Sequence, residues 1–166
     1  MTPPLHVIDA PAPGRLATMA HPRGGALLPG EMAALAGAGV RLLVSALTSA
    51  EYRRLALAAE PREAHAAGLE FVSFPIPDRR TPAPGIACDI LVDRLAGSLR
   101  RGEFVVIHCW AGIGRSSLLA AATLVRLGLT PPEAWRRISE ARGLLVPGND
   151  GQVDWLDEFA CAAQRA

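Results

Sequence analysis

The sequence predicts an α/β fold in which a central, mostly parallel sheet is flanked by helices. Short apolar runs of strand length alternate along the chain with segments that have the spacing of amphipathic helices. Such alternation is typical of strands that are joined by helical crossovers. The 166 residues contain no internal repeat and no linker, so we expect residues 1–166 to form a single domain with a sizeable core.

The first half of the chain contains strand and helix patterns separated by turns rich in glycine and proline. One or two short strands are expected over 5–8 and 15–19, a buried strand over 40–47 and a further strand over 69–74. Helices are expected over 29–38, 51–58 and 64–67. In the first of these helices, Leu35 packs inward and Gly37 or Gly39 ends the helix.

The second half begins with a polar, proline-stiffened loop over 75–85, of the kind that presents side chains. The helix expected over 86–99 has four apolar residues at helical spacing: Ile90, Leu91, Leu95 and Leu99. The apolar run 104–107 predicts the central strand. Further helices are expected over 116–127, 130–141 and 150–163. The second of these starts with Thr-Pro-Pro-Glu at 130–133, which has the form of a capping box with proline at the first helical position.

The composition narrows the class of protein. Half of the residues are hydrophobic and the formal net charge is +1, which argues against a disordered chain and against a nucleic-acid partner. No apolar stretch is long enough to span a membrane, and the N-terminus lacks the pattern of a signal peptide. The three cysteines lie far apart, so we expect a reduced, cytoplasmic protein. No metal site or other cofactor is expected, because His6, His21 and His65 have no metal-ligand spacing.

The rest of the chain is organised around the ten residues His-Cys-Trp-Ala-Gly-Ile-Gly-Arg-Ser-Ser at 108–117. They place a thiol, Cys109, and a guanidinium, Arg115, in one loop between the central strand and a helix. Gly112 and Gly114 let the loop curl so that several backbone N–H groups point at one centre. The N-terminus of the following helix also favours an anion. The loop is therefore predicted to form a cup for a tetrahedral oxyanion with a sulfur at its base.

The chemistry of this loop follows from its residue types. A cysteine attacks only as its thiolate, and the converging amides, the helix N-terminus and Arg115 each favour that form of Cys109. Arg115 suits bidentate binding of two oxyanion oxygens. Ser116 can donate a hydrogen bond to the sulfur and help it leave in a second step. His108 either bonds nearby backbone and holds the loop in shape or is simply a buried residue at the end of a strand.

Phosphate transfer to a thiolate also needs an acid that protonates the departing oxygen, a contribution of about 10²–10⁴-fold. Asp78 is the candidate, because it lies on the exposed loop that follows a strand. The same carboxylate can then activate water against the phosphocysteine. An aspartate in a Pro-Asp loop also commonly forms a turn, so the catalytic hypothesis depends on the position of Asp78 relative to Cys109.

These residues resemble a known family. The sequence His-Cys-Trp-Ala-Gly-Ile-Gly-Arg-Ser matches the His-Cys-x5-Arg-Ser/Thr signature of cysteine-dependent protein phosphatases. The separation of acid and nucleophile, 109 − 78 = 31 residues, and the segment Phe-Pro-Ile-Pro-Asp at 74–78 resemble the dual-specificity group. Within it, the chain is similar to the branch related to the cyclin-dependent kinase inhibitor 3 phosphatase. The similarity runs weakly over 28–159 and strongly over 74–127.

The resemblance implies a protein tyrosine phosphatase-like fold and a phosphocysteine intermediate on Cys109, with Asp78 as acid and then base. It also implies that phosphate is held by the Arg115 side chain and by the loop amides of Trp110, Ala111, Gly112, Ile113, Gly114 and Arg115. Many relatives carry a glutamine that positions the hydrolytic water before the last helix. Here Asn149 or Gln152 can fill that role, whereas Asn149 or Asp150 can also cap the helix.

Several nearby residues have two interpretations each. Trp110 either shields the thiol or contacts the substrate, or it packs beneath the loop. Arg142 either braces the phosphate loop or caps its own helix. Arg79 and Arg80 either attract an acidic partner or are solvated loop charges. Cys88 is more consistent with a small buried hydrophobe than with a disulfide partner of Cys109.

The sequence thus predicts an enzyme that hydrolyses phosphomonoesters on a phosphorylated protein or peptide. Phosphotyrosine is the expected substrate, with phosphoserine and phosphothreonine as further ones. One alternative is a phosphatase for a phosphoinositide or nucleotide, which the absence of lysine from the loop disfavours. Another is a non-catalytic module that binds phosphoproteins, which the presence of cysteine, arginine and acid disfavours. The sequence makes no prediction for the oligomeric state.

Overall fold

The computed structural model describes residues 3–165 and contains a five-stranded sheet with strand order β1-β2-β5-β3-β4. β1 is antiparallel to β2, and the other neighbouring strands are parallel. This confirms the predicted α/β fold with a mostly parallel central sheet. The strands are β1 (His6–Ile8), β2 (Arg15–Met19), β3 (Val40–Ser45), β4 (Glu70–Ser73) and β5 (Phe104–His108).

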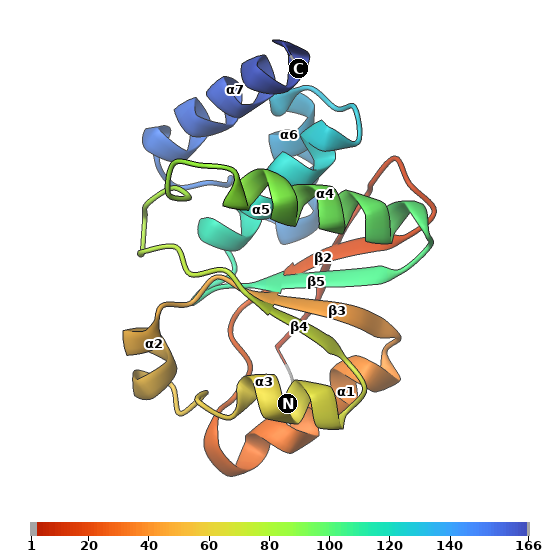
Figure 1. Cartoon of the computed structure of the whole chain (residues 1–166), viewed down its shortest axis with the longest axis vertical. Helices are drawn as coiled ribbons and strands as arrows, with labels where there is room; N and C mark the ends of the chain where they lie inside the picture. The colour runs from red at the N-terminus through yellow and green to blue at the C-terminus, as the bar shows by residue number, and fades with distance from the viewer. Residues whose placement is uncertain (1–2, 166) are drawn as a thin grey trace.

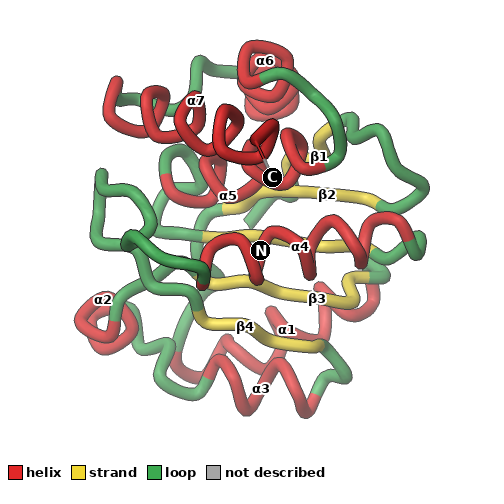
Figure 2. Tube along the Cα trace, turned by 45° about the horizontal axis from the view of Figure 1, so that its top comes forward, coloured by secondary structure: helices red, strands yellow, loops and turns green. Residues whose placement is uncertain are grey.

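Helices cover both faces of the sheet (Figure 1). One face carries η1 (Gly25–Leu27), α1 (Leu28–Gly37), α2 (Ser49–Arg54) and α3 (Glu60–Ala66). The other carries α4 (Ala87–Arg100), α5 (Arg115–Arg126), α6 (Pro131–Arg142) and α7 (Asp150–Arg165). Figure 2 shows the same two layers with the strands between them. Within the described residues, no helix is long and apolar enough to cross a membrane.

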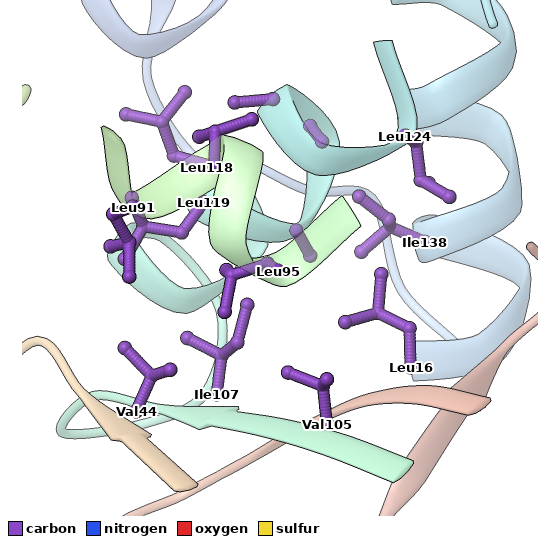
Figure 3. Close-up of a cluster of buried hydrophobic side chains, with 14 of the residues drawn as sticks. Leu16, Val44, Leu91, Leu95, Val105, Ile107, Leu118, Leu119, Leu124 and Ile138 are labelled. Atoms are coloured by element: carbon purple, nitrogen blue, oxygen red, sulfur yellow. The ribbon is translucent and has the colours of Figure 1, made fainter. Parts of the chain in front are cut away.

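The alternation of side chains along each strand divides the apolar core into two clusters. Val44, Val105 and Ile107 point to the face that α4 and α5 cover, where Leu95 and Leu119 meet them (Figure 3). On the opposite face, Leu43 and Val106 pack with residues of α1 and α3. Successive strand residues point to opposite faces, so strands that are buried on both sides read as nearly continuous apolar runs.

The carboxyl ends of the parallel strands lie at one edge of the sheet, and the loops that follow them are tied together there. The backbone N–H of Ala46 donates to the carbonyl of His108 at 2.9 Å, just beyond the ends of β3 and β5. The N–H of Ile76 donates to the carbonyl of Ala46 at 3.0 Å. The loop after β4 is thereby held beside the end of the central strand, which is where such sheets bind ligands.

The structure corrects several expected boundaries. α2 begins at Ser49, because Thr48 and Glu51 form a capping box that starts the helix before residue 51. α3 begins at Glu60, well before residue 64, because proline at the next position suits a first helical turn. In α4, Leu91, Leu95 and Leu99 are buried as their spacing predicts, whereas Ile90 faces solvent and is 60% exposed.

Truncation of Leu95 to alanine is expected to lower the free energy of unfolding by about 2–5 kcal/mol, because its side chain is fully buried between α4 and the sheet. The matched control is Ile90→Ala on the same helix, which should change it by about 0.5 kcal/mol or less. Urea unfolding followed by circular dichroism measures both. Equal losses would contradict this packing of α4 against the sheet.

Candidate active site

The loop 109–114, called here the phosphate loop, joins the end of β5 to the start of α5. Gly112 gives the loop its shape. Its φ is 70°, and a Cβ at this position would lie 2.6 Å from the carbonyl carbon of Met19. The phosphate loop therefore passes directly against the backbone at the end of β2, where only glycine fits.

Cys109 lies at the floor of a cavity of about 550 Å³ and is only 3% exposed. Its Sγ is 3.3 Å from the hydroxyl oxygen of Ser116, which is fully buried in the first turn of α5. The loop residues Trp110, Ala111, Ile113 and Gly114 line the same cavity, together with Asp78 and Arg115. The structure thus brings together the predicted nucleophile, serine, arginine and acid.

The Arg115 side chain is almost completely buried and is held by groups from α2 and from the loop after β4. Its guanidinium donates to both carboxylate oxygens of Glu51, at 2.7 and 2.8 Å. It also donates to the carbonyl of Ile76 at 2.9 Å, and it lies 3.4 Å from a carboxylate oxygen of Asp78. The bidentate pair with Glu51 fixes the plane of the guanidinium.

The electrostatics of this pair keep both groups charged. Burial favours the neutral form of Glu51, but hydrogen bonds from Arg115 and Thr48 outweigh it and lower the pKa of Glu51 to about 2. Burial likewise opposes the charge of Arg115. Hydrogen bonds to Glu51 and the nearby negative charges of Cys109, Glu51 and Asp78 outweigh it, so the pKa of Arg115 is raised above its ordinary value.

Asp78 lies on the loop after β4, with its side chain 71% exposed. It lines the same cavity as Cys109 and lies 3.4 Å from the guanidinium of Arg115, in the first turn of α5. The next residue, Arg79, has a φ of 61°, an uncommon conformation for a residue with a side chain. The exposed carboxylate is therefore carried by a tight turn at the mouth of the cavity.

His108 is a buried partner of a second glutamate. Its Nε2 lies 2.7 Å from Oε1 of Glu60 in α3, and both side chains are completely buried. Its Nδ1 is 3.5 Å from the carbonyl of Cys109, at the limit of a hydrogen bond. The pair fastens the end of β5 to the helix layer below the sheet, which combines the two interpretations that the sequence allowed for His108.

Arg142, at the end of α6, contacts the outer side of the phosphate loop. Its guanidinium donates to the carbonyls of Ala111 and Gly112 at 3.3 and 3.2 Å. The helix itself ends at Gly143 in a left-handed conformation. Arg142 therefore braces the loop, and Gly143 supplies the cap.

Two residues before and within α7 complete the wall of the cavity. Gln152 is completely buried, and its Nε2 donates to the carbonyl of Arg80 at 3.0 Å. Its Oε1 has no hydrogen-bond partner in the described structure. The side-chain oxygen of Asn149 accepts from the N–H of Gln152 at 2.9 Å, and its Nδ2 donates to the carbonyl of Arg79 at 3.3 Å. Asn149 thus caps α7 and also contacts the loop 74–86, called here the acid-bearing loop because it carries the predicted acid, Asp78.

Trp110 forms part of the cavity rim, between a side chain from α2 and one from the loop after β2. The guanidinium carbon of Arg54 lies 5.1 Å from its ring centroid, and the ring of His21 meets it edge-on at 5.7 Å. The indole is only partly buried and lines the cavity. Trp110 therefore both packs against neighbouring loops and is accessible from the cavity.

Cys88 is 4% exposed in the core of α4. Burial, together with the charge of Asp89, raises the pKa of its thiol to about 12. Such a thiol is a poor nucleophile, which is consistent with its interpretation as a small buried hydrophobe.

Sequence reasoning missed Glu51, Glu60 and Arg54. Glu51 had a detectable signal, because Thr48 and Glu51 stand at capping-box spacing just after a strand. Glu60 and Arg54 have no local signal, since their partners lie 48 residues away at His108 and in the phosphate loop at Trp110.

Comparisons with known proteins agree with this geometry. The cyclin-dependent kinase inhibitor 3 of Rattus norvegicus is 36% identical over 94 residues, which span 55% of this chain and 44% of that protein. The protein of the same name from Homo sapiens is 33% identical over 87 residues, or 51% of this chain and 41% of that protein. The chain thus spans less than half the length of these curated relatives.

Solved structures share the fold. Kinase associated phosphatase with its catalytic-site cysteine replaced by serine superposes with a TM-score of 0.86 at 20% identity, over 100% of this chain and 98% of that one. Tk-PTP in its active form has a TM-score of 0.75 at 26% identity, over 96% and 98%. Human DUSP28 has a TM-score of 0.70 at 25% identity, over 99% and 97%. These likenesses confirm the predicted phosphatase-like fold.

A family model described as "Tc-R-P: Polymorphic toxin system, DSP-PTPase phosphatase" matches residues 17–129. This span begins within β2 and contains β3 to β5, α5, the acid-bearing loop and the whole phosphate loop. The match covers more than half of the chain, and the chain therefore belongs to this family of DSP-PTPase phosphatases.

Proposed function

We propose that this chain hydrolyses phosphomonoesters on proteins through a phosphocysteine intermediate on Cys109. Phosphotyrosine is the expected substrate, with phosphoserine and phosphothreonine as further ones. The observation that carries the proposal is the shared cavity of Cys109, Arg115 and Asp78, which brings together a buried thiol, a fixed guanidinium and an exposed carboxylate. Family membership supports the same activity.

In the first step, the thiolate of Cys109 attacks phosphorus and the bond to the leaving oxygen breaks. Arg115 and the amides of the phosphate loop hold the three equatorial oxygens, where negative charge is concentrated. Because Glu51 fixes the guanidinium in advance, little reorganisation is needed as the transition state forms. Asp78, in its protonated form, donates its proton to the departing oxygen.

In the second step, water attacks the phosphocysteine and the sulfur leaves. Asp78, now a carboxylate, accepts a proton from that water. Ser116 is 3.3 Å from the sulfur and stabilises the thiolate as it departs. Of the two candidates for positioning the water, Gln152 fits better. Its buried Oε1 is free to accept a hydrogen bond in the described structure, whereas both polar atoms of the Asn149 side chain are already bonded.

The rim of the cavity favours a peptide substrate. Trp110 offers an aromatic surface beside the phosphate site, and Arg79 lines the same opening. No lysine occurs in the phosphate loop to contact further phosphates of a phosphoinositide.

The three cysteines are all free, which fits the reducing conditions of the cytoplasm, where we place the protein.

Replacement of Cys109 by serine should lower the turnover of para-nitrophenyl phosphate by at least about 10³-fold, because the nucleophile is lost. The matched control is Cys161→Ser, which removes an exposed cysteine near the end of α7 and should leave turnover unchanged. Release of inorganic phosphate measures both. Substantial turnover by Cys109→Ser would exclude the proposed mechanism.

Asp78→Asn should lower kcat/KM for a phosphotyrosine peptide by about 10²–10⁴-fold, because an amide cannot protonate the departing phenoxide. Substrate binding should persist, since Arg115 and the phosphate loop are unchanged. Steady-state kinetics and the affinity for the intact phosphopeptide are the measurements. Asp157→Asn, an exposed substitution on α7, is the control. A normal rate for Asp78→Asn would assign the acid to another group.

Glu51→Gln should raise the dissociation constant for orthovanadate by about 10–100-fold, because the buried guanidinium of Arg115 loses its charged partner. Glu63→Gln breaks the pair with Arg62, which is exposed, and should have little effect. Competitive inhibition of para-nitrophenyl phosphate hydrolysis gives both constants. Equal affinities in Glu51→Gln and the unaltered protein would show that Arg115 needs no anchor.

The pair should also make stability depend on pH. The pKa of Glu51 is about 2 in the folded protein and near 4.5 ordinarily, so its contribution is present above the ordinary value and is lost as the pH falls toward 2. Thermal unfolding between pH 6 and 3 should therefore be less pH-dependent in Glu51→Gln than in the unaltered protein. Parallel curves for the two proteins would contradict this assignment.

A further inference from the structure

Two side-chain amides at the start of α7 donate to consecutive carbonyls of the loop that carries Asp78. Asn149 Nδ2 bonds the carbonyl of Arg79 at 3.3 Å, and Gln152 Nε2 bonds the carbonyl of Arg80 at 3.0 Å. These contacts bridge 70 and 72 residues of sequence. We call this pair of hydrogen bonds the amide clamp.

The loop that the clamp holds makes a tight turn at Asp78. The N–H of Arg80 donates to the carbonyl of Pro77 at 3.0 Å, which closes a four-residue turn with Asp78 and Arg79 in its centre. The positive φ of Arg79 is sterically costly for a residue with a Cβ. The Asp78 side chain is 71% exposed, and its contact inside the cavity is the 3.4 Å ion pair with Arg115. Contacts from outside the turn are therefore needed to keep Asp78 over Cys109.

The other end of the clamp is rigid. The N–H of Gln152 donates to the side-chain oxygen of Asn149. This bond orients the Asn149 amide so that its nitrogen faces the loop. Gln152 is completely buried, and its amide lies against Gly114, where a Cβ would come within 3.2 Å of Oε1. Gln152 thus contacts the acid-bearing turn and the phosphate loop at the same time.

We propose that Asn149 and Gln152 are positioning residues that hold the acid-bearing turn closed, so that Asp78 stands beside the leaving oxygen. The proposal rests on the proposed function, because it acts through Asp78 as the acid. It assigns Asn149 a role other than water positioning, and it gives the amide nitrogen of Gln152 a role separate from that of its oxygen. Loss of the clamp lets the turn move away from Cys109, and protonation of the leaving group becomes less efficient.

The sharpest variant is Asn149→Ser, because serine keeps an oxygen that caps α7 while it removes the amide that reaches Arg79. The leaving group supplies the readout. The phenol of phosphotyrosine has a pKa of about 10 and needs a proton as it departs, whereas a fluorinated coumarin phosphate releases a much more acidic phenol. Asn149→Ser should lower kcat/KM by about 5–20-fold for the phosphotyrosine peptide and by about twofold or less for the coumarin phosphate.

The control for a change at the start of α7 is Asp150→Asn, which alters an exposed residue that directly follows Asn149. It should leave the ratio of the two kcat/KM values unchanged. Thermal unfolding of Asn149→Ser should remain close to that of the unaltered protein, because the helix cap is kept. A similar loss for both substrates in Asn149→Ser would mean a general structural role and would overturn the proposal.

A double-mutant cycle separates this proposal from the proposed function. If the clamp acts through Asp78, Asn149→Ser should have no further effect on the phosphotyrosine peptide once Asp78→Asn is present. Additive losses would overturn the clamp while leaving Asp78 as the acid. If Asp78→Asn itself shows no dependence on the leaving group, the acid assignment fails and the clamp fails with it.

Discussion

The buried ion pair between Arg115 and Glu51 is the interaction on which the site depends. A guanidinium sealed at the base of a cavity is costly unless its charge and its donors are matched. Here Glu51 supplies both carboxylate oxygens from α2, and Ile76 supplies a carbonyl from the loop after β4. One cation thereby connects α5, α2 and the acid-bearing loop, which follow three different strands of the sheet. The proposed phosphate site therefore depends on the pairing of charges from these separate elements.

Most of the fold was predictable, because strands buried on both faces and amphipathic helices leave strong apolar patterns. The short helices α2 and α3 were placed wrongly at their starts, because Thr48 and Pro61 set those starts without any apolar period. Cys109, Arg115 and Ser116 could be found because one loop carries them all. Glu51 and Glu60 could not, since each meets its partner only after the sheet brings distant loops together.

The phosphate loop is held from both sides of the sheet. Above it, Arg142 bonds two of its carbonyls and so directs them away from the cavity. Below it, the buried contact of His108 with Glu60 fixes the end of β5. Gly112 permits the loop to lie against Met19 without a gap. These supports come from residues to which the proposed mechanism assigns no chemical step, and together they fix the shape of the loop whose amides are proposed to bind phosphate.

The start of α7 determines how much of the chain a fragment must contain to keep the cavity closed. Gly148, Asn149 and Gln152 line the cavity, yet they lie beyond residue 129, where the family match ends. A fragment cut to the matched region would retain Cys109, Arg115 and Asp78 but would leave the cavity open on one side. The residues proposed to do the chemistry and the residues that complete the cavity wall thus lie in different parts of the chain. Substitutions at the start of α7 can therefore alter the wall while the reacting residues are unchanged.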